Sequence, residues 1–143
     1  MVCFFYFDID HAVGIHDWII ENSGGREGVL NIGNLESPLC HVQNDEYYPQ
    51  IEDKLTFLVY SINKNHAFED GNKRSSIALG AYFLQLNGYG YVVSRFVRNM
   101  ENIAVWVADN KVGRELLQEL LVSILYEDDF SETLKLKLIM AIH

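Results

Sequence analysis

Residues 72–86 read Asn72-Lys-Arg-Ser-Ser-Ile-Ala-Leu-Gly-Ala-Tyr-Phe-Leu-Gln-Leu86, and this stretch decides the fold class. From Ile77 onward it is apolar nearly all round, and Asn87-Gly88 ends it. A helix that is apolar on all sides belongs in the middle of a helical bundle rather than at its surface. A glycine just past the last turn supplies a left-handed cap. The stretch therefore predicts a central, buried helix.

Amphipathic segments flank this stretch on both sides, with apolar residues recurring at three- and four-residue steps. That spacing predicts further helices. We expect them from Asp8 to the Ser23-Gly24-Gly25 stop and over about 34–41, 50–64, 98–109, 112–126 and 131–142. Strand signals are sparse and no internal repeat occurs, so the predicted fold class is all-α, a compact helical bundle.

The connecting segments carry expectations of their own. Pro38 is expected inside the first turn of its helix, where its missing N–H matters least. Residues 26–34, which are rich in glycine, are expected to form a loop. Residues 90–93 are expected to be briefly extended, and the aromatic run 1–7 to form a short strand or a coil packed on the body.

The composition bounds the class of protein. A chain of 143 residues fits one domain, 1–143, and leaves no room for a second full-sized core. Eleven Lys and Arg stand against 20 Asp and Glu, a net charge of -9, and a field of that sign repels nucleic acid. Cys3 and Cys40 are too few for a disulfide framework. No export or membrane-spanning segment is visible, so we expect a cytoplasmic protein without nucleic-acid or membrane partners.

The loop before the central helix reads His66-Ala-Phe-Glu-Asp-Gly-Asn-Lys-Arg74. Gly71 and Asn72 stand at the start of the helix, where unpaired backbone N–H groups and the helix dipole favour an anion. Lys73 and Arg74 add positive charge at the same end, where the dipole disfavours it. Cations placed against the dipole indicate a polyanionic ligand, such as the phosphates of a nucleotide triphosphate.

His66 and Asp70 flank this phosphate site. Histidine is the side chain most easily poised as a base at neutral pH, and an aspartate beside phosphates is a natural Mg²⁺ ligand. Phe68, between them, is expected to point inward and anchor the loop. Base, metal ligand and phosphate site together indicate phosphoryl or nucleotidyl transfer to a hydroxyl, although no Walker loop is present.

The pattern His-x-Phe-x-Asp-Gly-Asn-Lys-Arg over 66–74 resembles the signature of the Fic superfamily, and specifically of its Doc (death-on-curing) branch. Ala67, Lys73 and Ile77 stand where AMP-transferring Fic proteins carry proline, glycine and a second arginine, and these departures are typical of Doc. The resemblance covers about residues 6–126 and leaves 127–143 as an extension. It implies the Fic/Doc-type helical bundle, in which a short N-terminal strand or a flap hairpin is an additional expectation.

The resemblance also implies a role for each matching residue. His66 would take the proton from the target hydroxyl, and Asp70 would bind Mg²⁺. The phosphates of ATP would be bound by Gly71, Asn72, Lys73 and Arg74. In Doc-type proteins a lysine fills the space that glycine leaves in AMP-transferring members, and the γ-phosphate of ATP is transferred instead of AMP.

Doc-type proteins act as toxins that phosphorylate a threonine of elongation factor Tu and are neutralised by an antitoxin, so the resemblance implies both partners. The connection 44–48 corresponds in position to the flap that docks target segments, and Tyr47 and Tyr48 are predicted to align the substrate main chain there. Residues 23–28 match the letters of a Fic inhibitory helix, [ST]-x-x-x-E-[GN]. Because two adjacent glycines favour a loop over a helix, we read that match as accidental and expect a separate antitoxin.

Alternatives stay open at several positions. Asp70 could also cap the helix, Arg74 could pair with a carboxylate such as Glu69, and His16 is expected to pack within its helix with a hydrogen bond to the backbone. For the whole protein, the alternatives are a nucleotidyl transferase that attaches AMP to a protein hydroxyl and a catalytically idle binding module.

Overall fold

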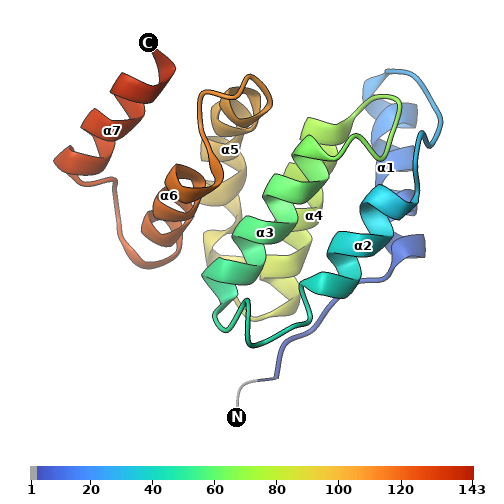
Figure 1. Ribbon diagram of the computed structural model, residues 1–143, viewed down its shortest axis with the longest axis horizontal. Coiled ribbons are helices and arrows are strands. Elements are labelled where there is room, and N and C mark those ends of the chain that lie inside the picture. The colour runs from blue at the N-terminus through green and yellow to red at the C-terminus, as the bar shows by residue number, and fades with distance from the viewer. Residues whose placement is uncertain (1–2) are drawn as a thin grey trace.

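The computed structural model describes residues 3–143, and the all-α prediction is confirmed because these residues form helices and no strand. The elements are α1 (Ile9–Ser23), α2 (Gly33–His41), α3 (Ile51–Lys64), α4 (Asn72–Leu86), the short 3-10 helix η1 (Gly90–Val92), α5 (Val93–Ala108), α6 (Arg114–Tyr126) and α7 (Glu132–Ile142). In Figure 1, α3 and α4 lie in the middle, α1 and α2 on one side, α5 and α6 on the other, and α7 outermost. None of the helices within residues 3–143 is long and apolar enough to cross a bilayer.

The central helix α4 has the bounds that the sequence predicts, and it packs against α1, α3 and α5. Leu79, Phe83 and Leu84 on it are completely buried. Gly80 lies where its neighbours come closest: a Cβ there would be 2.8 Å from Cζ of Phe96 on α5 and 2.9 Å from Cγ2 of Val59 on α3. Any larger residue would push these helices apart. The close approach on both sides fixes α4, and with it the loop from which α4 starts.

The N-terminal segment is a coil rather than a strand over the residues that the structure describes. The side chain of Asn87, just after α4, holds this segment through two hydrogen bonds. Its Oδ1 accepts from the N–H of Phe5 at 2.9 Å, and its Nδ2 donates to the carbonyl of Phe5 at 3.0 Å. The side chain of Phe7 is buried in the core. The predicted run 1–7 is therefore a coil packed on the body, except that residues 1 and 2 lie outside the described part.

The segment that follows α4 differs from its prediction in two places. Gly88 adopts φ +86° as the expected left-handed cap, but residues 90–92 form the 3-10 helix η1 instead of an extended segment. Helix α5 then begins at Val93, five residues before the predicted start at Arg98. The physical reason is burial: Phe96 and Met100 are both fully buried one turn apart on the same face of α5, and tertiary packing overrides the strand preference of the valines.

Pro38 is not in the first turn of its helix. Helix α2 begins at Gly33, so Pro38 is its sixth residue and removes the N–H that the carbonyl of Asn34 would accept. The side chain of Asn65 replaces that donor, with Nδ2 lying 3.3 Å from the carbonyl oxygen of Asn34. In return, Nδ2 of Asn34 donates to the carbonyl of Asn65 at 2.7 Å. This reciprocal pair ties α2 to the residue that precedes His66.

Candidate active site

The residues around His66 lie at the end of the molecule where two connections meet. These are the His66 loop (residues 65–71), between α3 and α4, and the α1–α2 connection (residues 24–32), which lie side by side in Figure 1. The N–H groups of Leu30 and Asn31 donate to the carbonyl of Ala67 at 2.9 and 3.1 Å, and the N–H of Glu69 donates to the carbonyl of Gly28 at 3.0 Å. The predicted loop at 26–34 ends at residue 32, because α2 begins at Gly33, and it is hydrogen-bonded along the His66 loop.

Phe68 anchors the His66 loop in the core, as the sequence predicts. Its side chain is fully buried, and its ring stacks face to face on the ring of His16, with centroids 3.7 Å apart and planes 4° from parallel. Nε2 of His16 lies 2.6 Å from the main-chain carbonyl oxygen of Asp70. The expectation that His16 packs in its helix with a hydrogen bond to the backbone is confirmed, and its partner belongs to the site.

Gly71 turns the chain into α4 with φ +81°, a conformation that other residues seldom adopt. The helix has no side-chain cap and no acidic residue in its first turn. The side chain of Asn72 turns back to the loop: Nδ2 donates to the carbonyl of Phe68 at 3.0 Å, and Oδ1 accepts from the N–H of Phe68 at 3.3 Å. The first backbone N–H groups of α4 therefore stay available to an anion.

Asp70 is an ionised, accessible carboxylate rather than the helix cap. The pKa of Asp70 lies below its usual value, chiefly because the backbone N–H groups of Arg26 and Gly71 donate to it, with a further contribution from the positive charges of Arg74 and Arg26. The two hydrogen bonds measure 3.1 Å to Oδ2 and 2.8 Å to Oδ1. Its side chain keeps 41% of its surface exposed, so the carboxylate remains open to a cation.

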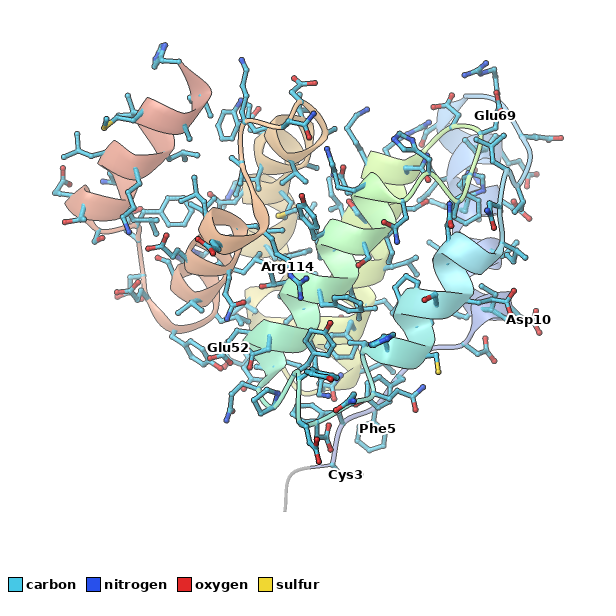
Figure 2. The ribbon with its side chains drawn as sticks, in the orientation of Figure 1. Cys3, Phe5, Asp10, Glu52, Glu69 and Arg114 are labelled. Atoms are coloured by element: carbon cyan, nitrogen blue, oxygen red, sulfur yellow. The ribbon has the colours of Figure 1, made fainter. Side chains whose placement is uncertain are left out.

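Arg74 pairs with Asp70 and the α1–α2 connection, not with Glu69. Nη1 of Arg74 donates to the carbonyl of Gly24 at 2.8 Å, and Nη2 lies 3.9 Å from Oδ1 of Asp70. Glu69 pairs with Arg26 instead, at 3.1 Å; Figure 2 shows Glu69 beside the α1–α2 connection. His66 and Lys73 are exposed. The structure therefore brings Asp70 and Arg74 into contact beside the start of α4, with exposed His66 and Lys73 in the same segment.

Tyr47 and Tyr48 are not brought to this site. They precede α3, whereas His66 follows it, and the 14 residues of α3 separate the two ends by about 20 Å. The ring of Tyr48 stacks on Phe57 of α3 at 4.4 Å, and Tyr47 is exposed. Residues 42–50 form turns without a hairpin. The segment that lies along the His66 loop is the α1–α2 connection.

Sequence reasoning missed the contribution of that connection. Gly24, Gly25 and Gly28 all have positive φ, and residues 24–28 form a loop rather than a helix, while Ser23 ends α1. A Cβ on Gly25 would lie 2.8 Å from Oδ2 of Asp70 and 2.9 Å from Nη2 of Arg74. The spacing of the glycines is the one signal in the sequence for this close approach.

Comparison with known proteins gives an independent match. The model of the family described as Fic/DOC matches residues 6–84, more than half of the chain. The match ends inside α4, so α5, α6 and α7 lie outside it, whereas the motif resemblance runs on to residue 126.

Two curated relatives are similar to part of this chain. A protein named "Toxin Doc" from Mycolicibacterium smegmatis is 38% identical over 69 residues, which are 46% of this chain and 53% of the relative. A protein named "Protein kinase doc" from Escherichia phage P1 is 31% identical over 83 residues, 55% of this chain and 65% of the relative. The similarity thus spans between about half and two thirds of each relative.

Proposed function

The chain belongs to the Fic/DOC family, and from that premise we propose that it is a Doc-type protein kinase. It would transfer the γ-phosphate of ATP to a hydroxyl side chain of a protein target. The observation that carries the proposal is the start of α4, where uncapped backbone N–H groups, two cations and an ionised carboxylate lie together. Lys73 and Arg74 bring two positive charges to this end of the helix in a chain whose net charge is -9, and these cations attract a polyphosphate there.

The residues present suit Mg²⁺ held together with a nucleotide. No group of three or more His, Cys, Asp or Glu side chains that could hold a metal occurs among residues 3–143. Mg²⁺ in phosphate-transfer sites usually uses one or two carboxylates and completes its shell with phosphate oxygens and water. Asp70, ionised and 41% exposed, would be that carboxylate. When bound, the ion would neutralise charge that develops on the phosphates.

In this proposal one side chain acts as the base and others bind the phosphates. His66 would accept the proton of the target hydroxyl, whose oxygen then forms a bond to the γ-phosphorus. The bond from the γ-phosphorus to the bridging oxygen breaks, and ADP leaves with the electron pair. Lys73 and Arg74, with the N–H groups of α4, would hold the phosphates in line with that attack. Arg74 must exchange part of its contact with Gly24 and Asp70 for the phosphates.

Lys73 favours transfer of the γ-phosphate over transfer of AMP. It occupies the position where AMP-transferring Fic proteins have glycine, and its exposed side chain at the helix start fills space that a phosphate would otherwise take. The names of the two relatives, a toxin and a protein kinase, support the same activity. We extend the proposal to a toxin that arrests translation by phosphorylating elongation factor Tu and is held inactive by an antitoxin.

The test uses ATP labelled at the α- or at the γ-phosphate, with Mg²⁺, purified elongation factor Tu and a cell extract as acceptors. Label that reaches protein only from the γ-position supports the kinase. Label from the α-position would replace the kinase with a nucleotidyl transferase, and no label from either would leave a binding module. His66→Ala should abolish transfer. His41→Ala is the matched control, because His41 is an exposed histidine at the end of α2 away from the site.

A further inference from the structure

A second histidine lies directly behind the site and has no part in the reaction proposed above. His16, on α1, is completely buried. Its ring is stacked on Phe68, and its Nε2 lies 2.6 Å from the carbonyl oxygen of Asp70. A carbonyl oxygen only accepts hydrogen bonds, so Nε2 of His16 must carry a proton and donate it. This contact joins α1 to the His66 loop across 54 residues of chain.

Two neighbours fix the orientation of the His16 ring. The stack on Phe68 sets the plane of the ring, and Oδ1 of Asp17, 3.2 Å from Nδ1, faces its other nitrogen. Gly71 lies beside the same ring, since a Cβ on Gly71 would be in van der Waals contact with Cδ2 and Nε2 of His16, at 3.4 Å. The donor is thus held in place before any ligand arrives.

The bond from His16 acts on a single rigid unit of the loop. The carbonyl of Asp70 and the N–H of Gly71 belong to one planar peptide group. His16 holds the carbonyl end of that plane, and the N–H end donates to the carboxylate of Asp70 at 2.8 Å. Fixing the carbonyl therefore fixes the direction of the N–H, and this N–H holds Oδ1 of the carboxylate while the N–H of Arg26 holds Oδ2.

We propose that His16 is a positioning residue, which sets the orientation of the Asp70 carboxylate through the peptide that links Asp70 to Gly71. The inference rests on the proposed function, in which Asp70 holds Mg²⁺. It assigns no proton transfer to His16. What matters is a donor at the Nε2 position, and the ring serves to hold that donor.

Three variants separate the donor from the ring. His16→Phe keeps a ring that can stack on Phe68 and removes the donor. His16→Gln removes the ring and keeps an N–H at the place of Nε2. His11→Phe is the matched control, because His11 lies on the same helix with its ring stacked on Tyr82 at 4.3 Å and does not contact the loop.

Phosphate transfer gives the first measurement. We expect His16→Phe to lower kcat at least tenfold and to raise the Mg²⁺ concentration needed for half-maximal rate by a similar factor, with the KM for the protein target unchanged. His16→Gln should stay within threefold of the wild type, as should His11→Phe. Equal losses in His16→Phe and His16→Gln, or no loss in His16→Phe, would overturn the proposal.

The second measurement needs no activity. In the nucleotide-free protein, the amide proton signal of Gly71 should shift in His16→Phe and stay near its wild-type position in His16→Gln. If wild-type protein transfers no phosphate while the Gly71 signal behaves as described, the proposed function fails and the positioning contact stands. If His16→Phe does not fold, Asp17→Asn replaces it: Asp17 is 67% exposed, and a shift of the same signal is expected there, whereas an unmoved signal counts against the inference.

Discussion

The backbone N–H of Arg26 donates a 3.1 Å hydrogen bond to Oδ2 of Asp70, although 44 residues separate the two along the chain. This bond is the largest cause of the lowered pKa of Asp70. It comes from a loop outside the signature segment, so the electrostatics of the site depend on how residues 24–32 fold against the His66 loop.

Asp70 should make the stability of the protein fall at low pH. Because its pKa is lower in the folded state than its ordinary value of 3.8, its ionised form stabilises the fold at neutral pH, and this contribution is lost as pH falls from 3.8 through the lowered pKa. Asp70→Asn should therefore unfold more easily than wild type at pH 7, with the difference shrinking below pH 3.8. Urea unfolding over a pH series measures it, and a constant difference would contradict the assignment.

Gly25→Ala should damage both the fold and the site. The new Cβ would lie 2.8 Å from Oδ2 of Asp70 at a backbone φ of +128°, and such strain lowers the free energy of unfolding by about 1–3 kcal/mol. Binding of Mg²⁺-ATP, followed by calorimetry, should weaken as well. Gly14→Ala is the control: nothing lies within 4 Å of its Cβ, and alanine inside a helix should stabilise the protein by about 0.5–1 kcal/mol. Similar effects of both changes would argue against the close approach.

Because Asn65 supplies the donor that Pro38 lacks, we expect the effects of Asn65→Ala and Pro38→Ala on the free energy of unfolding not to add. Asn65→Ala leaves the carbonyl of Asn34 without a donor and should lower the free energy of unfolding by about 1 kcal/mol. In a Pro38→Ala background the helix supplies the missing N–H, so the same change should have a smaller effect. Chemical denaturation of the two single variants and the double variant gives the coupling. Strict additivity would show that Asn65 does not stand in for the helix donor.

Lys73→Gly should lower transfer of the γ-phosphate about tenfold or more, since a hydrogen bond to a charged group contributes about 1.5–3 kcal/mol. Transfer of the α-labelled nucleotide should be unchanged or should appear for the first time, because the space for a phosphate is opened. ATP labelled at the α- or at the γ-phosphate distinguishes the two transfers. Lys111→Gly, in the turn between α5 and α6, controls for the loss of a surface charge. Unaltered γ-transfer would remove Lys73 from the site.

The parts of the structure that local patterns encode were predictable. Helix α4 runs from Asn72 to Leu86 as expected, since its apolar run and its Asn-Gly end are both contained in the segment itself. The same holds for the signature segment, where the residues of the site lie within nine positions. The start of α5 was missed because Val93 favours a strand locally, whereas the burial of Phe96 and Met100, which holds the helix, depends on other helices.

The contacts that hold Asp70 from other parts of the chain were not predictable from one sequence. The bonds from His16 and Arg26 to Asp70 span 54 and 44 residues, and no short pattern carries a contact of that length. Order in the chain predicts that Tyr47 and Tyr48 belong to the flap, whereas the length of α3 places them at the end of that helix away from His66.

His66 itself adopts φ +49°, a left-handed conformation that glycine adopts without penalty and that histidine adopts uncommonly, although more often than most other residues. The backbone at this position therefore suits a residue with no side chain better than the one it has. Keeping an imidazole at this turn therefore costs some stability, which His66→Gly would recover.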